Sequence, residues 1–146
     1  MNPDKLYLTQ TDTTVGFVSA DSKKLSIAKG RDVNQPFLIC VDSLKKLKNL
    51  TRVPKAHKKK IRKSTKTSFL YPNKKAIRVV TDTSHAKFLK EFDFLYSTSA
   101  NKNKEKFELE YALSKADIVV EDVKGFSENQ ASCFLKLGKN KLHKLR

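Results

Sequence analysis

The chain has 146 residues, of which 38% are hydrophobic, and its 31 Lys and Arg against 15 Asp and Glu give a formal net charge of +16. This length predicts one domain over residues 1–146, because a single core of this size buries roughly 70% of the surface that the unfolded chain exposes. The apolar runs are shorter than the about 20 residues that cross a bilayer, which argues against a membrane protein, and the charge excess favours a polyanionic partner such as nucleic acid or a phosphorylated ligand.

The first half of the chain alternates strand and helix patterns. Apolar runs at residues 6–8 and 36–41 predict two strands, and a polar loop over residues 9–14 follows the first of them. Asp21 or Ser22 can cap a short helix after this loop, and residues 42–50 have the polar start and the Leu spacing of a second helix.

Residues 55–66 are dominated by Lys and Arg and contain almost nothing to bury. We expect a mobile surface loop or a ragged helix here. As an RNA contact, this segment would bind phosphates without reading bases. The few aromatic residues among the charges argue against a stacking platform, and the alternative is a purely solvated surface.

The second half continues the alternation. The predicted elements are strands at residues 68–71 and 76–80 joined by a Pro-Asn turn, a helix around 88–92, a strand at 94–96, a helix at 107–113 and strands at 118–120 and 132–137. Alternating helices and strands predict an α/β fold with a sheet covered by helices, and the hairpin predicts that parallel and antiparallel pairing are mixed.

Cys40 and Cys133 each lie in an apolar, strand-like run, so we expect them to pack as small hydrophobic residues rather than to form a disulfide. This cysteine usage, together with a start at Met1 that lacks the pattern of a secretory signal, predicts a cytoplasmic protein. The three His residues are scattered singly, and no spacing of Cys and His suggests a metal site.

Two segments have side chains suited to polyanions. Lys29-Gly30-Arg31 places two cations around a glycine at the end of the first helix, where they could grip phosphates or simply complement the helix dipole. Ser97-Thr98-Ser99-Ala100-Asn101 offers three hydroxyls and an amide directly after a strand. Such a cluster suits phosphate oxygens or a Mg²⁺ ion, and ordinary turns and helix caps use the same residues.

The order of these segments in the chain is more specific than either one alone. The segments that carry it are Gln10-Thr11-Asp12-Thr13 with Gly16-Phe17, Lys29-Gly30-Arg31 before the strand that starts at Pro36, Ala76-Ile77-Arg78-Val79, Ser99-Ala100-Asn101, Gly125 with Ala131-Ser132-Cys133, and Arg146. With these motifs in this order, the sequence resembles the threonylcarbamoyl-AMP synthase family, the YrdC-type domain, over nearly its whole length.

The resemblance implies a YrdC-like fold, which is a twisted, mostly open sheet of mixed parallel and antiparallel strands with flanking helices and a basic concave cavity. It implies that L-threonine, bicarbonate and ATP are joined into threonylcarbamoyl-AMP with release of pyrophosphate. This is the first stage of N6-threonylcarbamoyladenosine (t6A) formation on tRNA, so the implied partners are tRNA or double-stranded RNA and the proteins of a t6A transferase complex.

The resemblance also implies a role for each matched residue. Lys29, Arg31, Ser99 and Asn101 would hold the ATP phosphates and Mg²⁺ and carry the catalysis, Arg146 would reach ATP, and Thr11, Arg78, Ser97 and Ser132 would bind threonine. An Arg such as Arg78 suits bidentate contact with an amino-acid carboxylate. No covalent nucleophile is needed, so catalysis would consist of positioning and charge neutralisation.

The chain departs from the family pattern close to this site. Gln10 stands for a Pro, Val15 for an aromatic residue, Gln35 for a Lys, Ser64-Thr65-Lys66 for Pro-Gly-Pro, and Lys102-Asn103-Lys104 for a Ser-Gly element. Two functions follow: a compact, divergent synthase, or a non-catalytic YrdC-like protein that binds RNA or nucleotides through a basic cavity. Threonine-dependent release of pyrophosphate would distinguish them.

Overall fold

A computed structural model of the chain describes residues 1–81, 83–121, 124–127 and 132–146. Its strands are β1 Tyr7–Gln10, β2 Val15–Ser19, β3 Leu38–Val41, β4 Thr67–Leu70, β5 Ala76–Val79, β6 Leu95–Ser99, β7 Ile118–Val119, β8 Cys133–Leu137 and β9 Leu142–Lys144. Its helices are α1 Ser22–Lys29, α2 Leu44–Leu50, the 3₁₀ helix η1 Lys55–His57, α3 Lys58–Lys63, α4 Ser84–Leu89 and α5 Leu109–Lys115.

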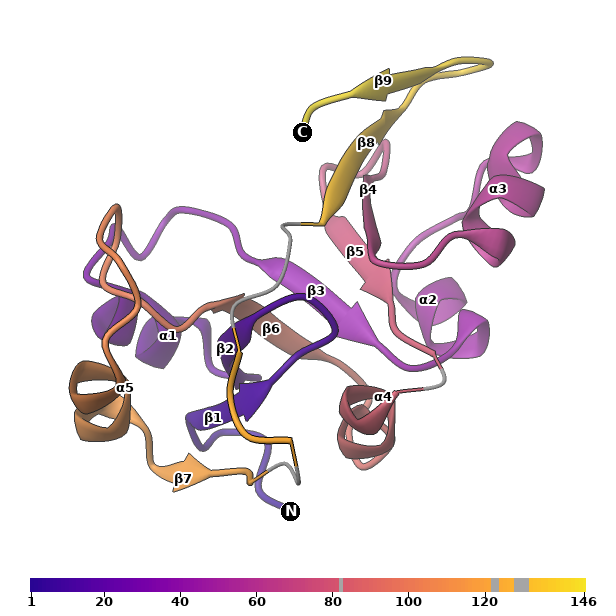
Figure 1. Ribbon diagram of the computed structural model, residues 1–146. Coiled ribbons are helices and arrows are strands. Elements are labelled where there is room, and N and C mark those ends of the chain that lie inside the picture. The colour runs from indigo at the N-terminus through magenta and orange to yellow at the C-terminus, as the bar shows by residue number, and fades with distance from the viewer. Residues whose placement is uncertain (82, 122–123, 128–131) are drawn as a thin grey trace.

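The strands form one open sheet in the order β7-β1-β2-β6-β3-β5-β4-β8-β9. The pairs β1–β7, β3–β5 and β4–β8 are parallel, and the other neighbours are antiparallel. The predicted α/β fold with mixed pairing is therefore confirmed. Figure 1 shows β1, β2 and β7 with α1 and α5 at one end of the molecule, and β4, β5, β8 and β9 with α2 and α3 at the other.

Both faces of the sheet carry helices, but to different extents. On one face, α1 and α5 pack over β1 and β2, and α2 and α3 pack over β3, β4 and β5. On the other face, α4 packs against Tyr7, Val18 and Cys40, whose neighbours in sequence point the opposite way. Because α4 is six residues long, it covers only part of this face.

Local signals begin and end α1 at the residues that the sequence predicted. The Asp21 carboxylate accepts hydrogen bonds from the backbone N–H groups of Lys23 and Lys24, and Gly30 ends the helix in the left-handed conformation, with φ of 70°. Lys29 is thus the last residue of the helix, and Arg31 follows it. Ser43 caps α2 in the same way, through the backbone N–H of Lys46.

The structure also differs from the prediction in detail. β2 and β9 were not predicted. β2 pairs with β1 directly after the predicted loop at residues 9–14, and of that loop only Thr9 and Gln10 belong to a strand, β1. Ser97, Thr98 and Ser99 belong to β6 itself rather than to a segment after it. Residues 55–66 contain η1 and α3, and Ile61 anchors α3 in the core, so most of this segment is helical.

The cysteines do not form a disulfide, as the sequence predicted. Cys40 is buried in the core under α4, and both it and Cys133 are free thiols. Ala131 of the resemblance lies outside the described residues. No helix in the described part of the chain has the length and apolar character needed to cross a membrane.

Candidate functional site

A cavity of about 470 Å³ lies on the sheet face that α4 only partly covers. Successive side chains of a strand point to opposite faces of the sheet. Arg78 on β5 and Ser97 on β6 point to this face and line the cavity. The predicted site residues that line it are Thr11, Arg31, Arg78, Ser97, Ser99, Ser132 and Arg146. The other two, Lys29 and Asn101, hydrogen-bond to the lining residue Ser99.

Lys29 lies at the end of α1 and reaches the last residue of β6. Its ammonium group donates to Asn101 Oδ1 at 2.7 Å, to Ser99 Oγ at 2.9 Å and to the Ser99 carbonyl at 3.0 Å. These three acceptors use all three of its protons, and none is a carboxylate. The buried cation is therefore held in place without being neutralised.

Burial and the nearby Arg31 guanidinium lower the pKa of Lys29 to about 8. Burial disfavours the charged form of a base because the protein solvates it less well than water does. Near neutral pH the ammonium remains mostly charged, and no carboxylate of the described residues forms an ion pair with it. An anion placed here would supply that counter-charge.

Arg31 follows α1 and lines the cavity. Its Nη2 donates to the Pro36 carbonyl at 2.7 Å, and its guanidinium carbon lies 3.9 Å from the centre of the Phe37 ring. Its buried Nε has no acceptor within the described part of the chain. Stacking on Phe37 thus orients the guanidinium, and its buried Nε–H is a donor that no described protein atom satisfies.

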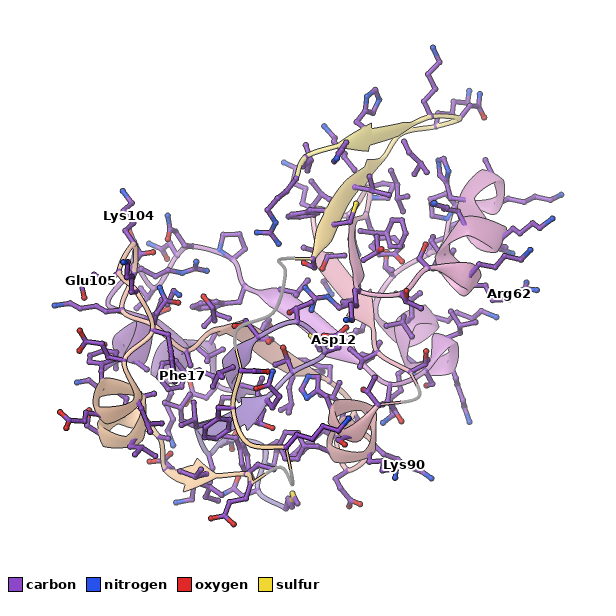
Figure 2. The ribbon with its side chains drawn as sticks, viewed as in Figure 1. Asp12, Phe17, Arg62, Lys90, Lys104 and Glu105 are labelled. Atoms are coloured by element: carbon purple, nitrogen blue, oxygen red, sulfur yellow. The ribbon has the colours of Figure 1, made fainter. Side chains whose placement is uncertain are left out.

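Arg78 is the best connected side chain of the site. It forms an ion pair with Asp12 at 2.9 Å, and it donates to Ser132 Oγ at 2.7 Å, to Ser68 Oγ at 3.0 Å and to Thr13 Oγ1 at 3.3 Å. The side chains of Arg78 and Asp12 are only 6% and 4% exposed. Figure 2 shows Asp12 near the centre of the molecule, on the loop between β1 and β2. This one guanidinium therefore joins four segments of the chain.

Thr11 shapes the loop that carries Asp12. Its hydroxyl donates to the Thr14 carbonyl at 2.7 Å and accepts from the backbone N–H groups of Thr13 at 3.2 Å and Thr14 at 3.1 Å. Gly16 lets this loop lie against β6, because a Cβ there would stand 2.9 Å from Thr11 Cγ2 and 3.1 Å from the Thr98 carbonyl. The Thr11 hydroxyl is thus occupied within the turn.

Arg146 is exposed, lines the cavity and shares a partner with Arg78. Its Nη2 donates to Ser132 Oγ at 3.0 Å, and its Nε donates to the Ser132 carbonyl at 3.3 Å. Two guanidinium groups therefore meet at one hydroxyl. Lys74 also lines the cavity. The side chains around the cavity therefore carry a net positive charge, even after the pairing of Arg78 with Asp12 is counted.

Sequence reasoning assigned no role to Asp12, Thr13, Ser68 or Lys74. Thr13 and Ser68 each accept a hydrogen bond from Arg78, and Lys74 lines the cavity from the β4–β5 turn with φ of 68°. The period-two pattern of the strand at 67–70 could have shown Ser68, since Phe69 beside it faces the core. Whether Thr13 and Lys74 reach the cavity depends on which distant segments of the chain pair, and no local sequence pattern predicts such pairing.

Two departures from the family pattern have structural roles here. The Gln10 side chain donates to the Ser127 carbonyl at 3.1 Å and accepts from its backbone N–H at 2.8 Å, which ties β1 to a segment far along the chain. Val15 is buried in the core under α1. Gln35, by contrast, is exposed in a turn and brings no charge to the cavity.

Comparisons with known proteins agree with this architecture. The Sua5/YciO/YrdC family model, described as "Telomere recombination", matches residues 2–121. Sua5 from P. abyssi complexed with L-threonine is similar over 97% of this chain and 50% of that chain, with 18% identity and a TM-score of 0.79. E. coli YciO is similar over 98% of this chain and 82% of its own, with 13% identity and a TM-score of 0.75.

MTH1692 from Methanobacterium thermoautotrophicum is similar over 97% of this chain and 79% of that chain, with 20% identity and a TM-score of 0.69. The chain spans only about half the length of P. abyssi Sua5. No curated protein sequence matches it significantly. The family model ends at residue 121, so Ser132 and Arg146 lie beyond the matched part.

Proposed function

Because the chain belongs to the Sua5/YciO/YrdC family, we propose that it forms threonylcarbamoyl-AMP and pyrophosphate from L-threonine, bicarbonate and ATP, for t6A modification of tRNA. The observation that carries this proposal is the convergence of the family's motif residues on one cavity. They come from the β1–β2 loop, the end of α1, β5, β6 and the segment before β8. Such convergence suits a site that must bring several substrates together.

The ATP phosphates fit the side formed by Lys29, Arg31 and Ser99. Lys29 has no carboxylate among its partners, and Arg31 has a free Nε donor. Cations that are fixed but not neutralised suit the charge of a triphosphate and of the pyrophosphate that leaves. Lys74 and Arg146 in the same lining add positive charge where Gln35 brings none.

L-threonine fits the side formed by Arg78, Asp12 and Ser132. A threonine zwitterion carries both signs of charge, and the buried Arg78–Asp12 ion pair presents both. Arg78 would contact the carboxylate, and the surrounding hydroxyls, such as those of Ser97 and Ser132, would contact the polar groups of the substrate. The structurally similar P. abyssi Sua5 forms a complex with L-threonine, which supports this choice of amino acid.

The proposed chemistry needs no covalent intermediate with the protein. The threonine nitrogen attacks the carbon of bicarbonate or of CO₂ derived from it, and a carbamate forms with loss of a proton, and of hydroxide in the bicarbonate case. A carbamate oxygen then attacks the α-phosphorus of ATP, and the bond to the β-phosphate oxygen breaks to release pyrophosphate. Lys29 and Arg31 would neutralise the charge on that leaving group.

Mg²⁺ would arrive as part of the ATP substrate. The predicted protein ligands, Ser99 Oγ and Asn101 Oδ1, both accept hydrogen bonds from the Lys29 ammonium, so direct coordination would require that ammonium to move. Mg²⁺ commonly takes several of its ligands from phosphate oxygens and water. We therefore propose that ATP phosphates hold the ion, while Ser99 and Asn101 position Lys29.

One observation favours a second candidate, a non-catalytic protein that binds nucleotides or RNA in the same cavity. Arg78 already uses Nε, Nη1 and Nη2 on protein partners, and Asp12 already neutralises it. Binding a threonine carboxylate in bidentate fashion would mean replacing some of those contacts. A protein that had lost the threonine reaction could keep such a closed arrangement.

Incubation with ATP, bicarbonate and Mg²⁺, with and without L-threonine, tests the proposal. We expect pyrophosphate release that depends on L-threonine and that L-serine supports less well. The Lys29→Ala and Arg31→Ala variants should abolish it while the fold, measured by circular dichroism, persists. Nucleotide binding without threonine-dependent pyrophosphate would instead support the non-catalytic candidate.

A further inference from the structure

Two departures from the family pattern change the charge near the end of α1. Gln35 stands where the pattern has a Lys, so one cation is lost from the loop that follows α1. Lys102-Asn103-Lys104 stands for a Ser-Gly element, so cations are gained in the loop that follows β6. Figure 1 shows these two loops side by side at one end of the molecule. A positive charge is therefore lost on one loop and gained on its neighbour.

The loop after β6 is fixed to the end of α1 by hydrogen bonds. The Asn103 backbone N–H donates to the Lys29 carbonyl at 2.7 Å. The Asn101 side-chain amide donates to the carbonyls of Lys102 at 3.0 Å and Glu105 at 2.6 Å, and the Glu105 N–H also donates to the Lys102 carbonyl, at 2.9 Å. The backbone of Lys102 is therefore held in place next to Lys29.

The side chain of Lys102 lies across Gly30, the residue that separates the two cations of the phosphate end. Its Cγ and Cε are 3.7 Å and 3.9 Å from the position that a Cβ on Gly30 would take. Because Gly30 has no side chain, the carbon stem of Lys102 can extend over its backbone. Lys29 and Arg31 flank Gly30 in the chain, so three cations gather at the end of α1.

The end of α1 does not need these cations as hydrogen-bonding caps. The backbone N–H groups of residues 30 and 31 donate to the carbonyls of Ser26 and Ile27. The Tyr111 hydroxyl donates to the Ala28 carbonyl, and the N–H of residue 103 donates to the Lys29 carbonyl. Neutral donors thus satisfy the last carbonyls of the helix, and the cationic groups are left for another use.

The ammonium group of Lys102 forms no ion pair or hydrogen bond within the part of the chain that the structure describes, and its side chain is exposed. The Asp32 carboxylate, which follows Arg31, accepts from the Asn34 N–H at 2.8 Å instead. Lys104 lies on the same loop, but Figure 2 shows it extending outward at the edge of the molecule. Of these two lysines, only Lys102 lies against the phosphate end.

We propose that Lys102 is a third phosphate-binding residue of the candidate site, which contacts the terminal phosphates of ATP and the pyrophosphate that leaves. This inference rests on the ATP site of the proposed function and not on its threonine chemistry. Lys102 supplies from the β6 loop the charge that Gln35 does not supply from the α1 loop. A lysine on a flexible stem can follow phosphate oxygens as pyrophosphate forms, whereas the buried Lys29 is fixed.

Calorimetric titrations with ATP and Mg²⁺, with inorganic triphosphate and with AMP test this proposal. Lys102→Gln removes the charge, Lys102→Arg keeps it, and Lys104→Gln is the matched control, because it removes the same charge from the outward side of the loop. We expect Lys102→Gln to weaken the binding of ATP and triphosphate about tenfold and that of AMP by less than about twofold, because AMP lacks the terminal phosphates. Lys102→Arg and Lys104→Gln should stay within about twofold of the native protein for all three ligands.

Equal losses in Lys102→Gln and Lys104→Gln would overturn the proposal, because they would show a response to net charge alone. So would equal losses for ATP and AMP, because Lys102 would then act on the shape of the site and not on the terminal phosphates. A native protein that binds neither ATP nor triphosphate would overturn it as well. The melting temperature of Lys102→Gln should equal that of the native protein, since the side chain is exposed, and a marked fall would assign Lys102 a structural role instead.

Pyrophosphate release distinguishes a failure of this inference from a failure of the proposed function. In an active enzyme, Lys102→Gln should raise the KM for ATP about tenfold and leave the KM for L-threonine unchanged. Threonine-dependent release with an unchanged KM for ATP would contradict the role of Lys102 alone. ATP binding with the expected dependence on Lys102, but without threonine-dependent release, would contradict the synthase and support the phosphate assignment.

Discussion

The two buried cations of the candidate site, Lys29 and Arg78, are held in opposite ways. Lys29 donates to neutral oxygens of Ser99 and Asn101, so its charge is positioned but uncompensated. Arg78 is paired with the Asp12 carboxylate, so its charge is cancelled where it stands. The difference suggests that one end of the cavity is prepared for an anion and the other for a ligand that carries both signs of charge.

Removing Arg78 should have the largest effect on stability. Arg78→Met would leave the Asp12 carboxylate buried without a partner and would release Thr13, Ser68 and Ser132. Loss of one member of a buried ion pair costs about 3–5 kcal/mol, so we expect a large fall in the free energy of unfolding, measured by urea denaturation.

The matched double variant, Arg78→Met with Asp12→Leu, removes both charges. It should recover a substantial part of that stability, because no buried charge is then left unpaired. Equal stability of the single and the double variant would show that the ion pair is not what holds the β1–β2 loop against β5.

Removing Lys29 should have the opposite pattern, with a large effect on activity and a small one on stability. Lys29→Met deletes a charge that no carboxylate of the described residues compensates, so we expect about a hundredfold or greater loss of pyrophosphate release and little change in the melting temperature. Loss of fold in this variant would assign Lys29 a structural role instead.

How much of this contrast the sequence could predict depends on whether the signal is local. Gly30 and Asp21 define α1, so the position of Lys29 at a helix end follows from residues close to it. The Pro72-Asn73 turn likewise predicts the β4–β5 hairpin that carries Arg78. These features are encoded within a few residues and were predicted correctly.

The long-range contacts were not predictable in this way. Asp12 and Arg78 are 66 residues apart and meet because the β1–β2 loop reaches β5. Strand order and register decide such a meeting, and hydrophobic patterns specify which face a strand presents but not its neighbour. The family resemblance supplied the grouping of Lys29 with Ser99 and Asn101, and it said nothing of the Asp12 pairing.

A buried histidine close to the Arg78 pair gives a smaller and pH-dependent effect. Burial, with a contribution from Arg78, lowers the pKa of His85 to about 4, although Asp12 acts in the opposite direction. The unfolded chain binds this proton near pH 6.5, so the unfolded state binds more protons between pH 4 and 6.5. The folded protein should therefore lose stability as the pH falls through this window.

His85→Leu tests this effect. Between pH 7.5 and 5, we expect the free energy of unfolding of the native protein to fall by about 2 kcal/mol more than that of the variant, as measured by urea denaturation at each pH. Parallel curves for the two proteins would mean that His85 does not titrate as its burial predicts.

Lys29 should make ATP binding depend on pH in the alkaline range. Its pKa of about 8 means that the free protein loses this positive charge as the pH rises above that value. The dissociation constant for ATP, measured by calorimetry between pH 7.5 and 9.5, should increase by up to about tenfold for each pH unit above 8. In Lys29→Met, binding should be weak and independent of pH over the same range, and a slope equal to the native one would assign the titration to another group.

The smallest effect expected concerns Lys74, at the turn between β4 and β5. Its exposed side chain lines the cavity and can add to the phosphate end only through solvent-screened attraction. Lys74→Gln should weaken ATP binding by about threefold, since exposed charge pairs contribute about 0.2–1 kcal/mol, and high salt should remove the difference. Lys75→Gln, one residue along the same turn and outside the lining, is the matched control. If Lys75→Gln weakens ATP binding as much, Lys74 acts only through net charge, and Lys29 is not assisted by a specific contact between Lys74 and the phosphates.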